Sequence, residues 1–289
     1  MCEQDDLLEI ARRANELTRR QFGAMALGAG LAAALPRAAD AADTTGTDVD
    51  IKTADGVTDA YFVHPAQGKF PGVLIWPDIF GLRPAFKQMA TRLAESGYAV
   101  LVINPFYRTK RAPTAPEHPD FNDPATRASL LGLAGTLNAS TAVTDAKAFV
   151  GFLDSQGSVD TKRKIGTTGY CMGGPFVFRT AAALPNRVGA GATFHGGGLV
   201  TDKPDSPHLL IPEMKAHALI AIAESDDKQQ PDAKQVLRTS YSKAGLSAEI
   251  EVYAGTQHGW CPPDSRVYDS VQAEKAWSRL LVLFGNSLA

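Results

Sequence analysis

Residues Gly169–Gly174 read Gly-Tyr-Cys-Met-Gly-Gly and connect an apolar run, Lys164–Tyr170, to a stretch with helical period, Pro175–Leu184. A strand, a sharp turn with glycine on both sides of one residue, and a helix form the context of a nucleophile elbow. Glycine suits both flanking positions, because a Cβ there would collide with the neighbouring strand and helix. Cys171 stands at the apex, where free N–H groups of the first helical turn surround its sulfur. The pattern favours a cysteine nucleophile, and the competing interpretation is a small buried thiol on a glycine-rich turn of the phosphate-binding kind.

Apolar runs rich in β-branched and aromatic residues alternate along the chain with stretches of helical period. The runs predicted to be strands are Tyr61–Val63, Val73–Trp76, Tyr98–Ile103, Lys164–Tyr170, Ala190–His195, His217–Ala223 and Ala248–Tyr253. The stretches predicted to be helices are Ala85–Ser96, Thr141–Ser155, Gly173–Leu184, Asp232–Ala244 and Tyr268–Leu288. The alternation indicates an α/β fold with a mostly parallel sheet and helices on both faces. A proline-rich stretch, Arg108–Asp123, interrupts it and is expected to form a surface excursion over a site.

The composition is that of a globular protein, since 44% of the 289 residues are hydrophobic and 21% are charged. The formal net charge of −2 provides no basic excess for phosphates, so no nucleic-acid partner is expected. The three cysteines are too few for a disulfide scaffold and lack the CxxC spacing of a zinc site. The histidines without a cysteine or carboxylate partner at ligand spacing are His64, His118, His208 and His217. We therefore expect neither a metal nor another cofactor.

Two partners for the elbow follow it in the order of acid and then histidine. Residues 224–227 read Glu-Ser-Asp-Asp and end a strand-like run, where a parallel sheet forms its ligand crevices. His258 lies in a loop before the last predicted helix and can accept the thiol proton, while an acid fixes its tautomer. The spacing after the strand favours Asp226 as that acid. Counting back from Pro231 favours Asp227, so both remain candidates.

Two further motifs accompany the elbow. Trp76–Gly81 reads Trp-Pro-Asp-Ile-Phe-Gly, and Gly97-Tyr98 is followed by Asn104–Arg108, which reads Asn-Pro-Phe-Tyr-Arg. With the elbow, these segments resemble the dienelactone hydrolase family of α/β-hydrolases, in its cysteine variant, from about Val49 to Leu288. The resemblance implies an α/β-hydrolase fold and hydrolysis of carboxylic ester or lactone bonds. No internal boundary divides residues 42–289, so we expect a single domain.

The resemblance also implies roles for individual residues. These are Cys171 as nucleophile, His258 as base, Asp226 as acid, the N–H groups of Met172 and Ile79 as oxyanion hole, and Asp78 in place of a glutamate that holds the resting thiol. The family member acting on dienelactone binds the substrate carboxylate with two arginines, of which Arg108 matches one and Pro262 replaces the other. Because proline cannot form a bidentate clamp, we do not expect carboxylate specificity. Arg108 and His195 are pocket candidates, although His195 could instead bond a backbone carbonyl.

The first 41 residues have the three parts of a secretory signal. Thr18–Phe22 reads Thr-Arg-Arg-Gln-Phe, Gly23–Leu35 carries no charge, and small residues follow at Ala39–Ala41. The paired arginines resemble the twin-arginine signal of bacterial export. The apolar run is shorter than the roughly 20 residues of a membrane helix, so no stable anchor is expected. We expect residues 1–41 to engage the twin-arginine export machinery and to be cleaved, which leaves a periplasmic or secreted protein; the alternative is an ordinary amphipathic helix.

The first functional hypothesis is an exported hydrolase of small-molecule esters or lactones that forms a thioester on Cys171. The runner-up is a non-catalytic small-molecule-binding protein on the same scaffold. A third hypothesis, a thiol redox protein using Cys171 and Cys261, is weakened by the absence of a CxxC motif. These two cysteines could form a disulfide in an oxidising periplasm, although we rather expect Cys261 to be a buried, unreactive thiol.

Overall fold

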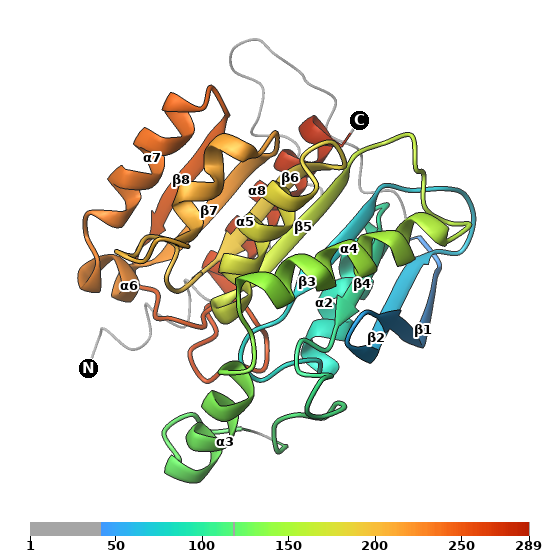
Figure 1. The fold of residues 1–289 in the computed structure, drawn as a ribbon, viewed down its shortest axis with the longest axis horizontal. Helices are drawn as coiled ribbons and strands as arrows, with labels where there is room; N and C mark the ends of the chain where they lie inside the picture. The colour runs from blue at the N-terminus through green and yellow to red at the C-terminus, as the bar shows by residue number, and fades with distance from the viewer. Residues whose placement is uncertain (1–41, 118, 289) are drawn as a thin grey trace, which may run out of the picture. The chain divides into compact units, whose positions relative to one another are not determined.

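An eight-stranded sheet forms the centre of the computed structural model, which describes residues 42–117 and 119–288 (Figure 1). The strands are β1 (Thr44–Thr53), β2 (Gly56–Pro65), β3 (Gly72–Trp76), β4 (Ala99–Ile103), β5 (Ile165–Tyr170), β6 (Val188–Phe194), β7 (His217–Ala223) and β8 (Ala248–Tyr253). Their order across the sheet is β1-β2-β4-β3-β5-β6-β7-β8. The β1–β2 and β2–β4 pairs are antiparallel, and all the others are parallel. The mostly parallel α/β sheet predicted from the sequence is confirmed.

Helices cover both faces of this sheet (Figure 1). One face carries α2 (Pro84–Glu95) and α8 (Ser270–Ser287), and the other carries α4 (Ala139–Ser155), α5 (Gly174–Ala183) and α7 (Ala233–Lys243). The shorter elements are α3 (Pro124–Ala134), α6 (Glu224–Gln229), and the 3₁₀ segments η1 (Cys171–Gly173) and η2 (Pro207–Glu213). Each of the five helices predicted from periodicity is present within two residues of its expected bounds.

The core lies in two layers, one on each face of the sheet. Every residue of β3 and β4 is buried, as expected for strands covered on both faces. Phe86, Leu93 and Leu280 pack in the layer under α2 and α8, while Phe149 and Phe176 pack under α4 and α5. Full burial of side chains of this size stabilises the fold by roughly 1.5–3 kcal/mol each. This packing gives the loops at the strand ends a fixed base.

Three elements differ from the sequence expectations. β1 was not expected, because only Ile51 of its ten residues is buried and the strand has no apolar run. α3 begins directly after the proline-rich stretch, with the Asp123 carboxylate accepting from the Thr126 N–H at 2.7 Å as its N-cap. The acidic residues 224–227 begin a short helix, α6, that the sequence patterns did not predict.

The predicted export signal, residues 1–41, lies outside the described part of the chain, and so does His118. Among the helices that the structure describes, none combines the length and the apolar character needed to cross a membrane.

The C-terminal ends of the parallel strands bring five candidate residues to one side of the sheet. Ile79 follows β3, Cys171 follows β5, His195 follows β6, Asp226 follows β7 and His258 follows β8. Because neighbouring parallel strands end at the same side, loops far apart in the sequence meet there. The candidate site is therefore assembled from five separate segments.

Candidate active site

Cys171 occupies the sharp turn between β5 and α5 in the left-handed backbone region, with a φ of 52°. A residue with a Cβ adopts such a φ only at an energetic cost, which the surrounding packing must impose. The turn is tight, because a Cβ on Gly169 would lie 2.2 Å from the carbonyl oxygen of Gly173, and one on Gly173 would lie 2.3 Å from that of Trp76. Cys171 itself is only partly buried. The turn thus presents its thiol to an approaching molecule.

His258 contacts both Cys171 and a carboxylate. Its Nδ1 lies 2.9 Å from Oδ2 of Asp226, and Cys171 lies near enough to raise the pKa of the ring. The neighbouring carboxylate, Asp227, instead accepts from Nζ of Lys234 at 2.6 and 2.7 Å. Of the two acids that the sequence left open, the structure brings Asp226 to the histidine.

The pKa of His258 reflects these contacts. Burial lowers it, but hydrogen bonds to Asp226 and Cys171, together with the charges of both groups, outweigh burial and raise the pKa from 6.5 to about 10. These contacts favour the protonated form of the imidazole. Its side chain is 39% exposed, so a substrate can reach it.

Ile79 and Met172 belong to two backbone segments that touch at the elbow. The carbonyl oxygens of Trp76 and Pro77 lie 2.3 and 2.8 Å from the position that a Cβ on Gly173 would take. Met172 directly follows the nucleophile in η1, and Ile79 lines the adjoining cavity. Within the described residues, no group accepts a hydrogen bond from the Ile79 N–H. This N–H is therefore not engaged by another group of the described chain.

A cavity of about 420 Å³ adjoins Cys171 and His258. Its other lining residues are His195, Gly259 and members of three loops, residues 78–83, 119–122 and 264–267. The proline-rich excursion thus contributes one wall of the cavity. Phe80 and Phe121 face each other in that wall, edge to face, with ring centroids 6.4 Å apart. A small organic molecule fits this space and would lie against both aromatic rings.

His195 is a buried, neutral histidine beside the site. It has a φ of 42° and is 1% exposed, and its ring meets the ring of His258 edge to face at 5.2 Å. By hydrogen-bond geometry, neither ring nitrogen has a partner within residues 42–117 and 119–288. His195 also lines the cavity. Burial, and then the charge of His258, lower the pKa of His195 well below 6.5.

Asp78 is bound to Arg83 rather than to the thiol. The two Asp78 oxygens accept from Nη1 and Nη2 of Arg83 at 2.7 and 2.9 Å, and one of them also accepts from the Phe80 N–H. The other side of the guanidinium, Nε and Nη2, donates to Asp264 at 2.6 and 3.0 Å. Burial raises the pKa of Asp78, while Arg83 opposes the rise. Asp78 lines the same cavity as Cys171, but its hydrogen bonds go to Arg83 and the Phe80 N–H rather than to the thiol. The sequence patterns did not indicate Arg83 and Asp264 as site residues.

Residues 58–288 match the dienelactone hydrolase family. The chain belongs to that family. A relative from Methylorubrum extorquens, named "Putative carboxymethylenebutenolidase", is 29% identical and covers 95% of this chain and 94% of its own length. A solved dienelactone hydrolase-like promiscuous phosphotriesterase from metagenomic libraries has a TM-score of 0.69 at 21% identity, covering 85% of this chain and 99% of its own. The family resemblance and the α/β-hydrolase fold predicted from the sequence are confirmed, and the protein is a hydrolase of the ester and lactone class.

Arg108 is not brought to the cavity of this dienelactone hydrolase family member. Its guanidinium donates to Asp145 of α4 at 2.7 and 2.8 Å and to Asp55 in the β1–β2 turn at 2.6 and 2.9 Å. The guanidinium also stacks over the ring of Tyr107. Arg108 thus connects the β1–β2 hairpin to α4. Although it matches a carboxylate-binding arginine of the family in sequence, it does not line the cavity.

The two described cysteines are both free thiols, and no disulfide joins them. Cys261 is buried, which raises its pKa. Within residues 42–117 and 119–288, no group of three or more histidine, cysteine, aspartate or glutamate side chains is arranged to hold a metal ion.

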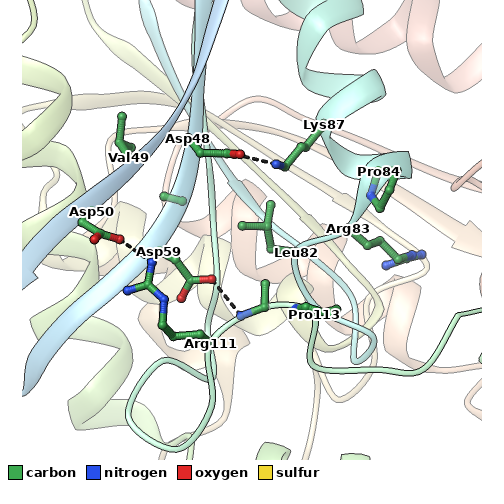
Figure 2. Close-up of a pocket in the computed structure, with 12 residues that line it drawn as sticks. Asp48, Val49, Asp50, Asp59, Leu82, Arg83, Pro84, Lys87, Arg111 and Pro113 are labelled. Atoms are coloured by element: carbon green, nitrogen blue, oxygen red, sulfur yellow. Dashed lines mark hydrogen bonds and ion pairs between the residues drawn. The ribbon is translucent and has the colours of Figure 1, made fainter.

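A second cavity, of about 660 Å³, lies beside β1, β2 and the start of α2 (Figure 2). Its charged residues are already bound, since Asp48 accepts from Lys87, Asp50 from Arg111, and Asp59 from the Ala112 N–H. No cysteine, serine or histidine lines it. Of these two cavities, the one of about 420 Å³ contains the candidate catalytic residues Cys171 and His258.

Proposed function

We propose that this dienelactone hydrolase family member cleaves small-molecule esters or lactones with a triad of Cys171, His258 and Asp226, through a thioester on Cys171. The observation that carries the proposal is the chain of contacts from Asp226 to His258, at 2.9 Å, and from His258 to Cys171. The strained turn at Cys171 supports it as well, because a binding pocket alone has no need of that backbone conformation. Family membership argues against the non-catalytic alternative.

The first half of the reaction forms the thioester. The Cys171 sulfur, as thiolate, attacks the carbonyl carbon of the substrate, and the carbonyl electron pair moves onto its oxygen. The N–H groups of Ile79 and Met172 stabilise this oxyanion. The carbon–oxygen bond to the leaving group then breaks, and the imidazolium of His258 donates its proton to the departing alkoxide. An ester releases an alcohol, while a lactone keeps the new hydroxyl on its acyl chain.

The second half hydrolyses the thioester. Acylation removes the charge of the Cys171 sulfur, and with it two of the interactions that raise the His258 pKa. The imidazole, which gave its proton to the leaving group, therefore stays neutral at this stage and accepts a proton from water. The water oxygen attacks the thioester carbon, the carbon–sulfur bond breaks, and its electron pair returns to sulfur. The acid leaves, and the thiolate–imidazolium pair is restored.

A panel of p-nitrophenyl esters and small lactones tests this proposal on the wild type, Cys171→Ala, His258→Ala and the double variant. If the residues act as a unit, each single variant loses nearly all turnover and the double variant is scarcely worse. Cys261→Ala serves as the matched thiol control and should retain activity. Hydrolysis that survives Cys171→Ala undiminished contradicts the thioester mechanism.

Export through the twin-arginine route is the second part of the proposal. It is supported by the Thr-Arg-Arg-Gln-Phe segment before a weakly apolar run and small residues at 39–41. Arg19→Lys combined with Arg20→Lys should trap the precursor in the cytoplasm. The upstream pair gives a matched control, since Arg12→Lys with Arg13→Lys should leave processing near Ala41 intact. Normal processing of the first double variant contradicts this route.

A further inference from the structure

We propose that the cavity selects substrates that carry no negative charge at the end lying against Arg83, because this buried arginine is already neutralised on both sides by Asp78 and Asp264. This inference rests on the proposed hydrolase function and names the substrate class of the same site. It concerns the part of the substrate that lies against Arg83, beyond the carbonyl held at Cys171.

Arg83 has no donor left for a substrate carboxylate. A guanidinium can bind carboxylates bidentately through its Nη1/Nη2 end or its Nε/Nη2 side. Asp78 occupies the end, at 2.7 and 2.9 Å, and Asp264 occupies the side, at 2.6 and 3.0 Å. Nη1 also donates to the Gly81 carbonyl. The arginine side chain is only 10% exposed, so it cannot turn away from these partners.

The charge around the arginine is negative rather than positive. Two carboxylates face one guanidinium, and both Asp78 and Asp264 line the cavity. Asp264 is 40% exposed and thus meets an entering substrate directly. A substrate carboxylate placed here would lose water, find no free donor on Arg83 and be repelled by Asp264.

The second arginine of the cavity, Arg266, is engaged as well. Arg266 donates from Nη1 to Asp120 at 2.9 Å, and its side chain is 66% exposed. A carboxylate that displaced Asp120 from so exposed a pair would gain little. The rest of the lining includes Phe80, Phe121 and Val267, which suit an uncharged alkyl or aryl group, and the neutral polar side chains Asn122 and Ser265.

A matched pair of substrates tests the selection. The first is the p-nitrophenyl ester of adipic acid with its distal carboxylate free, and the second is the same ester with that carboxyl methylated. The two differ at the distal end by one charge, far from the reacting carbonyl. The wild type should prefer the methylated substrate by about 10- to 100-fold in kcat/KM. Equal rates, or a preference for the carboxylate, overturn the inference.

Asp264→Asn tests the cause. It keeps the size of the side chain, removes one negative charge and loosens one side of Arg83, so it should reduce the preference for the methylated substrate by about tenfold. Asp205→Asn is the matched control, because Asp205 also pairs with a largely buried arginine, Arg179, away from the cavity. This variant should prefer the methylated substrate as strongly as the wild type does. An unchanged preference in Asp264→Asn overturns the role given to Arg83 and Asp264. So does a large loss of kcat/KM for the free-carboxylate substrate in Arg266→Gln, because it would show that Arg266 binds the carboxylate.

A binding measurement separates this inference from the proposed function. Cys171→Ala should bind the methylated substrate more tightly than the free carboxylate by calorimetry, whether or not the wild type turns either over. If the wild type hydrolyses neither compound but Cys171→Ala shows this difference, the reaction assigned above fails and the charge selection stands. If the wild type hydrolyses both and Cys171→Ala binds them equally, the charge selection fails and the hydrolase stands.

Discussion

Lys234 of α7 binds both carboxylate oxygens of Asp227, at 2.6 and 2.7 Å, and so holds this acid away from His258. Its neighbour Asp226 is left to accept from the imidazole. Asp226→Asn should lower kcat about 10²–10⁴-fold, because an amide can still hold the ring but stabilises the imidazolium poorly. Asp227→Asn should keep near-wild-type kcat and lose about 1 kcal/mol of stability at most. A crippled Asp227→Asn beside an active Asp226→Asn would show that the triad acid is the other residue.

The raised pKa of His258 depends on its two partners, so removing either should lower it. In Cys171→Ala, the pKa should fall from about 10 towards 6.5, as followed by NMR titration of the imidazole protons. Cys261→Ala is the control and should leave the titration of His258 unchanged. A pKa near 10 that persists in Cys171→Ala would exclude the proton exchange assigned to the second half of the reaction.

The same contacts link folding stability to pH. Since the folded-state pKa of His258 lies above its ordinary value of 6.5, its charged contacts stabilise the fold fully below about pH 6.5 and are lost as the pH rises through about 10. Wild type should thus be more stable than His258→Gln at pH 6, and the difference should shrink by pH 10.5. Urea unfolding at both pH values measures it. A difference that grows with pH has the wrong sign for this account.

The two described thiols should differ in reactivity. Cys171 is partly exposed and contacts the His258 imidazolium, whereas Cys261 is buried with a raised pKa. Limiting iodoacetamide followed by peptide mapping should label Cys171 first, and Cys261 only after unfolding. Cys171→Ala should remain unlabelled under the limiting conditions. Preferential labelling of Cys261 would reverse this assignment.

The elbow should tolerate no side chain at its second glycine. Gly173→Ala places a methyl 2.3 Å from the Trp76 carbonyl oxygen, so it should lose roughly 1–3 kcal/mol of unfolding free energy and most of its activity. Gly151→Ala is the matched control in the exposed middle of α4, where nothing lies within 4 Å of the new methyl. It should gain about 0.5–1 kcal/mol from helix propensity. A Gly173→Ala protein as stable and active as the wild type would show that the turn is not this tight.

Sequence patterns predicted the elements that carry apolar runs, together with the residues that end them. Cys171, Asp226 and His258 each follow a strand, and parallel strands end on the same side, so their meeting could be expected. The Arg83–Asp264 contact could not, because it joins loops 181 residues apart with no periodic signal in either. Arg108 was predicted to line the pocket but does not. A residue that matches a motif in sequence does not determine the direction of its side chain. β1 escaped because a strand with a single buried residue has no hydrophobic alternation.

The polar residues of β1, which kept it from being predicted as a strand, also affect how the edge of the sheet meets other molecules. Among the residues that the structure describes, β1 is the outermost strand beside β2, so one row of its backbone groups has no partner strand there (Figure 1). A long, flat, apolar strand in that place would invite a second molecule to continue the sheet and aggregate. β1 instead exposes Asp48, Asp50 and Lys52, and binds Lys87 and Arg111 through the two aspartates. Charge along this strand keeps the sheet from growing between molecules.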